Sequence, residues 1–147
     1  MSLKTWLDKG ALRAHKPSKK EIAGLLALAD RSLADARIAA VSPEGRFQFG
    51  YNAALSTASA ALHASGYRTN SNVAGHHAKT VQSLEHTIGA DAALVRKFDA
   101  FRRKRNRISY DKPLPVSDQE AADMLALAEK LRRDVEARIR EKHPTLI

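Results

Sequence analysis

The sequence predicts an all-α protein, a bundle of about five to six helices that forms one domain over residues 1–147. Apolar residues recur at steps of three and four along most of the chain, which is the spacing of one helical face. Serine followed three residues later by glutamate, the pattern of a helix-capping box, occurs twice. No stretch alternates between apolar and polar residues as a half-buried strand would.

The first half of the chain contains three predicted helices. A short helix is expected at about residues 3–14. The second begins at the capping box of Ser18, and its apolar face continues to Ala40. The third starts at Ser42-Pro43, because a serine cap followed by proline is typical of helix N-termini, and ends at Gly66. Its many alanines indicate close helix approach, and this face suits either an internal contact or a dimer seam.

The second half contains three more predicted helices. After a turn at 67–72, a fourth helix is expected over 73–89 and a fifth from about Asp91. Two prolines in the segment 110–117 predict an extended loop, because proline cannot continue a helix and restricts the residue before it. A last helix then begins at the second capping box and continues to His143-Pro144.

Composition limits the classes of function and location. The formal net charge of +9 and the pI near 10.1 favour a polyanionic partner, with nucleic acid first among the candidates. Aromatic residues make up only 5%, so we expect contact with phosphates rather than stacking on bases. There is no cysteine, which excludes thiolate metal sites and favours a reducing, cytoplasmic environment. Because neither a signal peptide nor a membrane-spanning run is evident, we expect no membrane association.

The most informative segment is FRRKRNRISYD, at 101–111. Arg105 continues an apolar stripe at steps of three and four, which consists of Leu94, Phe98, Phe101 and Ile108. We therefore expect Arg105 to point inward or into a cleft. An arginine keeps its proton, so partial burial costs roughly several kcal/mol unless an anion or hydrogen-bond acceptors meet it.

Two explanations of that arginine are open. It pairs with an acid of another helix, such as Glu120 or Asp123, as a structural ion pair. Alternatively, the helix end holds a phosphate or another anion. The local excess of charge favours the second explanation, because from Arg96 to Lys112 the only acids are Asp99 and Asp111 and the cations are Arg96, Lys97, Arg102, Arg103, Lys104, Arg105, Arg107 and Lys112.

Three segments together resemble the HEPN family over about residues 20–140: RNRISYD, the helix with Tyr51-Asn52-Ala53-Ala54-Leu55, and GHHAKTVQSLEHTIG at 75–89. HEPN domains are all-α bundles with an up-and-down core and usually form homodimers. Many are metal-independent ribonucleases of toxin–antitoxin and other defence systems. The resemblance therefore implies a homodimeric protein that binds RNA or a nucleotide, with an antitoxin protein as a further partner.

The HEPN motif is an arginine followed four to six residues later by a histidine, often with a polar residue directly after the arginine. Arg105 matches the arginine and Asn106 the polar residue, whereas Tyr110 stands where the histidine is expected. The resemblance implies that Arg105 contacts the scissile phosphate. A tyrosine, with a pKa of about 10, is a poor general base at neutral pH. Either the surrounding arginines favour its phenolate, or His76 or His77 serves in its place.

Other residues complete the predicted site. Arg102, Arg103, Lys104 and Arg107 would add phosphate contacts, and Asp111 is a further accessory residue. We expect no cofactor, since glycine-rich phosphate loops are absent from the sequence. We also expect no metal, because the adjacent His76 and His77 diverge by about 100° on a helix. His63 and His86 are scattered and receive no role.

Two competing functions remain open. The first is a catalytically inactive helical interaction module whose basic cleft binds an acidic protein partner. The second is a structural bundle in which Arg105 and Tyr110 tie the proline-containing loop to the helix end.

Overall fold

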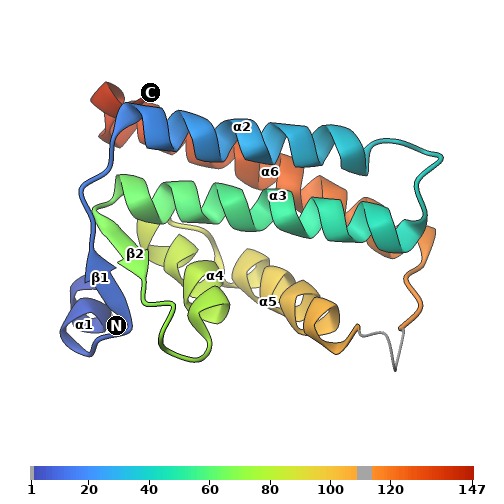
Figure 1. Ribbon diagram of the computed structural model, residues 1–147, viewed down its shortest axis with the longest axis horizontal. Helices are drawn as coiled ribbons and strands as arrows, with labels where there is room; N and C mark the ends of the chain where they lie inside the picture. The colour runs from blue at the N-terminus through green and yellow to red at the C-terminus, as the bar shows by residue number, and fades with distance from the viewer. Residues whose placement is uncertain (1, 109–113) are drawn as a thin grey trace.

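The computed structural model describes residues 2–108 and 114–147, and over these ranges the protein is an all-α bundle with one short two-stranded sheet (Figure 1). The prediction of an all-α bundle is confirmed. The elements are α1 (Leu3–Asp8), β1 (Leu12–Ala14), α2 (Lys19–Ala36), α3 (Pro43–Ala64), β2 (Tyr67–Thr69), α4 (His76–Thr87), α5 (Ala92–Arg107), α6 (Asp118–Lys142) and a final 3₁₀ turn, η1 (Pro144–Leu146).

Three long helices, α2, α3 and α6, run lengthwise side by side, and the shorter α4 and α5 pack against α3 from the other side (Figure 1). The core lies around α3, whose Phe47 and Tyr51 are among the largest fully buried side chains. The helices α2 to α6 each contribute apolar residues to that core, as the spacing of three and four predicts.

The alanine-rich face of α3 is an internal contact. Its alanines are almost completely buried, namely Ala53, Ala54, Ala58, Ala60, Ala61 and Ala64. Gly50 brings α3 closest to α6, because a Cβ atom placed there would lie 3.0 Å from Cγ of Met124. Small residues therefore let α3 approach its neighbours within the protomer, and this face is not available as a dimer seam.

The N-terminal prediction is wrong beyond Asp8. The helix expected at 3–14 stops there, and Gly10, with φ 80°, lies between α1 and β1. The strand β1 then pairs antiparallel with β2, so that Leu12 lies opposite Thr69 within the predicted turn. Strands of three residues are too short to show an alternating pattern, which explains why the sequence did not reveal them.

Two helix boundaries also differ from the prediction. The apolar face of α2 ends at Ala36, and Ala40 is exposed in the connection that follows. The fourth helix begins at His76 rather than Val73, because Gly75 adopts φ 80° at its N-cap. Val73 is consequently exposed. All three predicted capping serines are confirmed. Ser18 accepts from the backbone N–H of Glu21, Ser42 accepts from that of Gly45, and Ser117 forms a complete capping box.

None of the helices in the described ranges combines the length and the apolarity that crossing a membrane requires.

Candidate functional site

The C-terminal half of α5 carries the densest positive charge of the helices described. Over Ala92–Arg107 the helix contains one acid, Asp99, and seven cations: Arg96, Lys97, Arg102, Arg103, Lys104, Arg105 and Arg107. Two aromatic contacts anchor it to α3. Phe98 packs edge-on against Tyr51, with ring centroids 6.1 Å apart, and Phe101 packs against Phe47 at 5.7 Å. The helix therefore has a defined rotation about its axis.

Arg105 is exposed, so the buried, inward position that was one of the two expected for it is wrong, whereas the expected position in a cleft stays a prediction. It does lie on the core side of α5, because its guanidinium carbon is 5.9 Å from the centroid of the buried Tyr51 ring. The long side chain reaches over this ring while its charge stays in solvent. Neither predicted structural partner holds it. Glu120 pairs with Lys104, and Asp123 accepts a hydrogen bond from Gln119.

Three of the predicted phosphate-binding residues are engaged by acids. Arg102 donates to Asp99 at 2.8 Å, and Arg103 lies 3.2 Å from the other oxygen of the same carboxylate. Lys104 donates to Glu120 of α6. One carboxylate shared by two guanidinium groups leaves a net positive charge. Among the described residues, no ion pair engages four other exposed cations of α5, which are Arg96, Lys97, Arg105 and Arg107.

The N-terminus of α4 brings a histidine into the field of this helix. The rings of His76 and His77 lie 4.3 Å apart. Partial burial, His76 and the arginines Arg105 and Arg102 together lower the pKa of His77 below its ordinary value of 6.5. His77 is therefore mainly neutral at pH 7 and can accept a proton there.

Tyr51 forms the buried floor beneath Arg105. Its ring is 2% exposed, and its hydroxyl has no hydrogen-bond partner among the described residues. Burial raises the pKa of Tyr51, an effect that Arg105 and Arg102 partly offset. The contact of Tyr51 with Arg105 depends on the packing of α3 against α5 and has no local signal in the sequence.

The structure thus brings Arg105 and Arg102 close enough to act electrostatically on both Tyr51 and His77. Asn106 and Arg107 are exposed in the last turn of α5. Tyr110 and Asp111, the remaining predicted site residues, lie outside the described residues.

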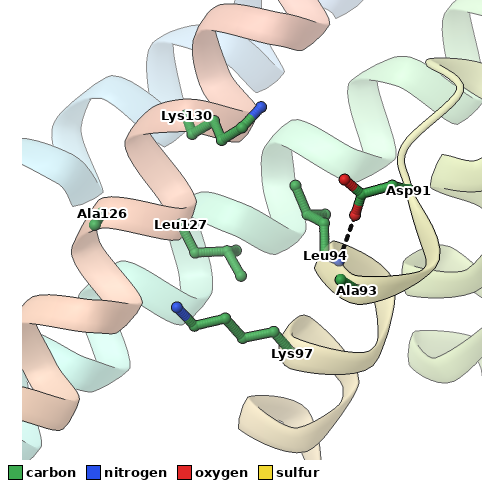
Figure 2. Close-up of a pocket in the computed structure, with 7 residues that line it drawn as sticks. All are labelled: Asp91, Ala93, Leu94, Lys97, Ala126, Leu127 and Lys130. Atoms are coloured by element: carbon green, nitrogen blue, oxygen red, sulfur yellow. Dashed lines mark hydrogen bonds between the residues drawn. The ribbon is translucent and has the colours of Figure 1, made fainter.

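A separate cavity of about 320 Å³ lies between α5 and α6 (Figure 2). Its floor is apolar and includes Leu94 and Leu127, and the amino groups of Lys97 and Lys130 lie at its edge. Asp91 also lines it, but that carboxylate accepts a hydrogen bond from the backbone N–H of Leu94 and caps α5. No residue of the last turns of α5 lines this cavity, so it is distinct from the Arg105 neighbourhood.

Comparison of the chain with protein-family models, curated proteins and solved structures found no match.

Proposed function

We propose that this protein binds RNA or a nucleotide through phosphate groups, as a HEPN-like homodimer. The binding surface, here called the α5 cationic surface, consists of Arg102, Arg103, Lys104, Arg105 and Arg107. One observation carries the proposal. The exposed guanidinium of Arg105, on a helix with seven cations and one acid, lies near the buried Tyr51 ring of α3. Such a surface attracts polyanions by charge and offers few aromatic faces for stacking.

Arg105 has the strongest claim to a direct phosphate contact. Its planar guanidinium can donate two parallel hydrogen bonds to phosphate oxygens. The Tyr51 ring, whose centroid lies 5.9 Å from the guanidinium carbon, attracts that cation and leaves its hydrogen-bond donors free for phosphate. Arg102 and Arg103 share Asp99, and they add positive potential without being fully neutralised.

A narrower proposal is metal-independent cleavage of the bound RNA. The neutral imidazole of His77 would take the proton from a ribose 2′-hydroxyl, and Arg105 would stabilise the charge that develops on the phosphate. The 2′-oxygen then bonds to phosphorus as the bond from phosphorus to the 5′-oxygen breaks. The leaving oxygen takes a proton from water and His77 returns its proton to water, which yields a 2′,3′-cyclic phosphate and a 5′-hydroxyl end. The lowered pKa of His77 supports this role, because a protonated histidine has no lone pair to accept the proton.

The first experiment compares the wild-type protein with Arg105→Ala on labelled mixed RNA in EDTA, on native and denaturing gels. We expect the variant to bind about tenfold more weakly, the effect of losing one charge-assisted phosphate contact of roughly 1.4 kcal/mol, and to lose cleavage. Arg31→Ala is the matched control, because Arg31 is an exposed arginine on α2, across the bundle from α5. Equal RNA affinity of Arg105→Ala and wild type would rule out the proposed contact.

That contrary result would favour the alternative, a catalytically inactive helical module that binds an acidic protein such as an antitoxin. The decisive measurement is then the affinity of wild type and Arg105→Ala for a small acidic protein encoded by a neighbouring gene. Salt dependence does not separate the two functions, because both depend on charge.

The homodimer is tested by sedimentation equilibrium. The chain has a mass of 16.1 kDa, and we expect a species of twice that mass. In a HEPN-like arrangement the two copies of Arg105 would face one cleft, so a variant that stays monomeric should also lose cleavage.

A further inference from the structure

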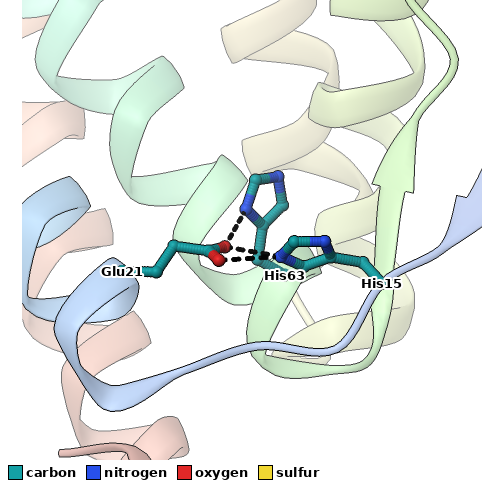
Figure 3. Close-up of side chains that lie close together, drawn as sticks. All are labelled: His15, Glu21 and His63. Carbon is teal, nitrogen blue, oxygen red and sulfur yellow. Dashed lines mark hydrogen bonds and ion pairs between the residues drawn. The ribbon is translucent and has the colours of Figure 1, made fainter.

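Three side chains from separate parts of the chain converge where α2 begins and α3 ends (Figure 3). His15 follows β1, Glu21 lies in the first turn of α2, and His63 lies in the last turn of α3. Nε2 of His15 is 2.7 and 2.9 Å from the two carboxylate oxygens of Glu21, and Nδ1 of His63 is 2.7 Å from one of them. One ligand atom from each residue lies within 4.8 Å of the other two.

The backbone holds these three residues in place. The N–H of His15 donates to the carbonyl of Gly66 at 2.9 Å, next to the antiparallel pairing of β1 and β2. The Ser18 hydroxyl accepts from the N–H of Glu21 at 3.1 Å and caps α2. All three side chains are half-buried, with 19% of His15, 30% of Glu21 and 24% of His63 exposed. The side chains would therefore lose little further conformational freedom when a ligand binds.

We propose that His15, Glu21 and His63 form a binding site for a divalent transition-metal ion, with Zn²⁺ as the best fit. The ligands are Nε2 of His15, Nδ1 of His63 and one carboxylate oxygen of Glu21, and water takes the fourth position. Two imidazoles and one carboxylate are a donor set that zinc accepts, and three protein ligands leave an open position.

The distances suit such an ion after small movements. In a tetrahedral site with bonds of about 2.0–2.1 Å, ligand atoms stand roughly 3.3 Å apart. The contacts to Glu21 would lengthen slightly, and the two histidine nitrogens, which lie within 4.8 Å of each other, would adjust to the same separation. Rotation about side-chain bonds achieves both changes, and the backbone contacts of His15 and Glu21 stay intact.

Metal binding also requires a change of tautomer. Without a metal ion, a neutral His15 donates to Glu21 through Nε2 and a neutral His63 donates through Nδ1. These are the same nitrogens that would bind the metal. When the ion displaces these hydrogen bonds, the proton moves to Nδ1 of His15 and to Nε2 of His63. No net proton has to leave the site.

The charge balance indicates a moderate affinity. The donor set carries one negative charge, from Glu21, against the two positive charges of the ion. Arg68 of β2 lies close enough to act on His63 and opposes a further cation. We therefore expect a dissociation constant in the range of about micromolar.

The proposal of this metal site is independent of the proposed RNA function. It lies where α2 begins, and α5 ends towards the other end of the bundle (Figure 1). A bound ion would connect the N-terminal segment, through His15, to two of the long helices. Because its fourth coordination position is open, the bound ion would also be accessible to water or to another small ligand.

The test is a Zn²⁺ titration of the full chain after EDTA treatment and dialysis, by calorimetry, with Co²⁺ absorption to report the geometry. The variants are His63→Gln and Glu21→Gln, which keep a hydrogen bond within the cluster but weaken the ligand set. His86→Gln is the control, because His86 packs against Trp6 outside the cluster. Circular dichroism establishes that each variant is folded.

We expect one Zn²⁺ per wild-type chain, a tetrahedral Co²⁺ spectrum and at least roughly tenfold weaker binding by both cluster variants. The control should bind as wild type does. Absence of binding to wild type, or equal binding by wild type and His63→Gln, would overturn the proposal and leave a hydrogen-bonded cluster. RNA binding by the EDTA-treated protein is expected to persist, so failure of this site and failure of the RNA proposal are separate results.

Discussion

At the scale of single residues, two arginines of α5 differ in what compensates their charge. Arg102 is only 17% exposed in its side chain and is held by Asp99 at 2.8 Å. Arg105 is exposed and has no ion pair among the described residues, and its guanidinium carbon lies 5.9 Å from the centroid of the Tyr51 ring. A cation–π contact at an exposed site contributes about 0.5–1 kcal/mol and leaves the hydrogen-bond donors free. Arg105 can therefore bind an external anion without breaking an ion pair, whereas Arg102 would have to give up its contact with Asp99.

Tyr51→Phe tests the buried hydroxyl. We expect the free energy of unfolding to stay the same or to rise by up to about 1 kcal/mol, because a buried hydroxyl without a partner is costly. RNA affinity should not change, since phenylalanine keeps the ring face beneath Arg105. Urea unfolding and gel-shift titration measure the two quantities. A loss of more than about 1 kcal/mol would mean that the hydroxyl has a partner beyond the described residues.

His77 predicts opposite pH trends for binding and for cleavage. Its pKa is lowered from 6.5, so it gains a proton only as the pH falls below that value. Protonation adds a positive charge and should tighten RNA binding, whereas it removes the base and should slow cleavage. Initial cleavage rates and RNA affinities measured between about pH 5 and pH 8 would show both trends. The His77→Gln variant should show neither of these two pH dependences. Parallel trends in wild type would exclude His77 as the base.

At the scale of elements, one glutamate connects α5 to the start of α6. Glu120 accepts from Lys104 of α5, and its other oxygen accepts from the backbone N–H of Ser117 at 3.2 Å to complete the capping box. These two hydrogen bonds lower the pKa of Glu120. The position of the α5 cationic surface therefore depends in part on an acid of another helix.

Glu120→Gln should reveal this connection through pH. The pKa of Glu120 in the folded chain is lower than its ordinary value of 4.5, so its stabilisation is present above that value and disappears as the pH falls through the folded pKa. We expect the variant to be less stable than wild type at pH 7, and we expect this difference to become smaller as the pH falls from 4.5 towards about 3. Urea unfolding at both pH values measures this.

Two further variants calibrate that experiment. Glu141→Gln, an exposed position of α6, should match wild type at either pH. Ser117→Ala removes the capping hydroxyl and should cost about 1 kcal/mol at both. A pH-independent loss in Glu120→Gln would mean that the side chain acts through packing.

At the scale of the whole molecule, the N-terminal segment is attached to the bundle by a small second core. Trp6 and Leu12 pack on Leu62 of α3, and Lys79 of α4 lies 4.7 Å from the centroid of the Trp6 ring. His86 packs against the edge of the same ring at 5.3 Å. The single tryptophan of the chain thus connects α1 with α3 and α4.

Trp6→Ala should lower the free energy of unfolding by about 3 kcal/mol, because it removes a 5% exposed ring and leaves Leu62 uncovered. Urea unfolding followed by circular dichroism measures this loss. Lys79→Met is the control: it should change the tryptophan fluorescence and cost at most about 1 kcal/mol. A loss below 1 kcal/mol in Trp6→Ala would mean that the N-terminal segment folds independently of α3 and α4.

Local patterns predicted most of the helices, and their failures have physical causes. The capping serines Ser18 and Ser117 were found because a cap and its glutamate are three residues apart in the sequence. The short strands escaped detection, since the pairing of Leu12 with Thr69 joins residues that are far apart along the chain. Arg105 was placed correctly on the core side of α5. Its exposure was not predicted, because the spacing of residues contains no information on how far a long side chain reaches.

The all-α class, the helix starts at the capping residues Ser18, Ser42 and Ser117, and the concentration of cations on α5 follow from the sequence, because these features depend on residues close together in the chain. Tertiary structure alone decided which side chains meet. It placed Tyr51 under Arg105 and His77 within the field of both nearby arginines. It also joined His15 and Glu21 to His63, which is 42 residues beyond Glu21 in the chain. Such contacts arise from helix packing, and no periodicity along a single helix specifies them.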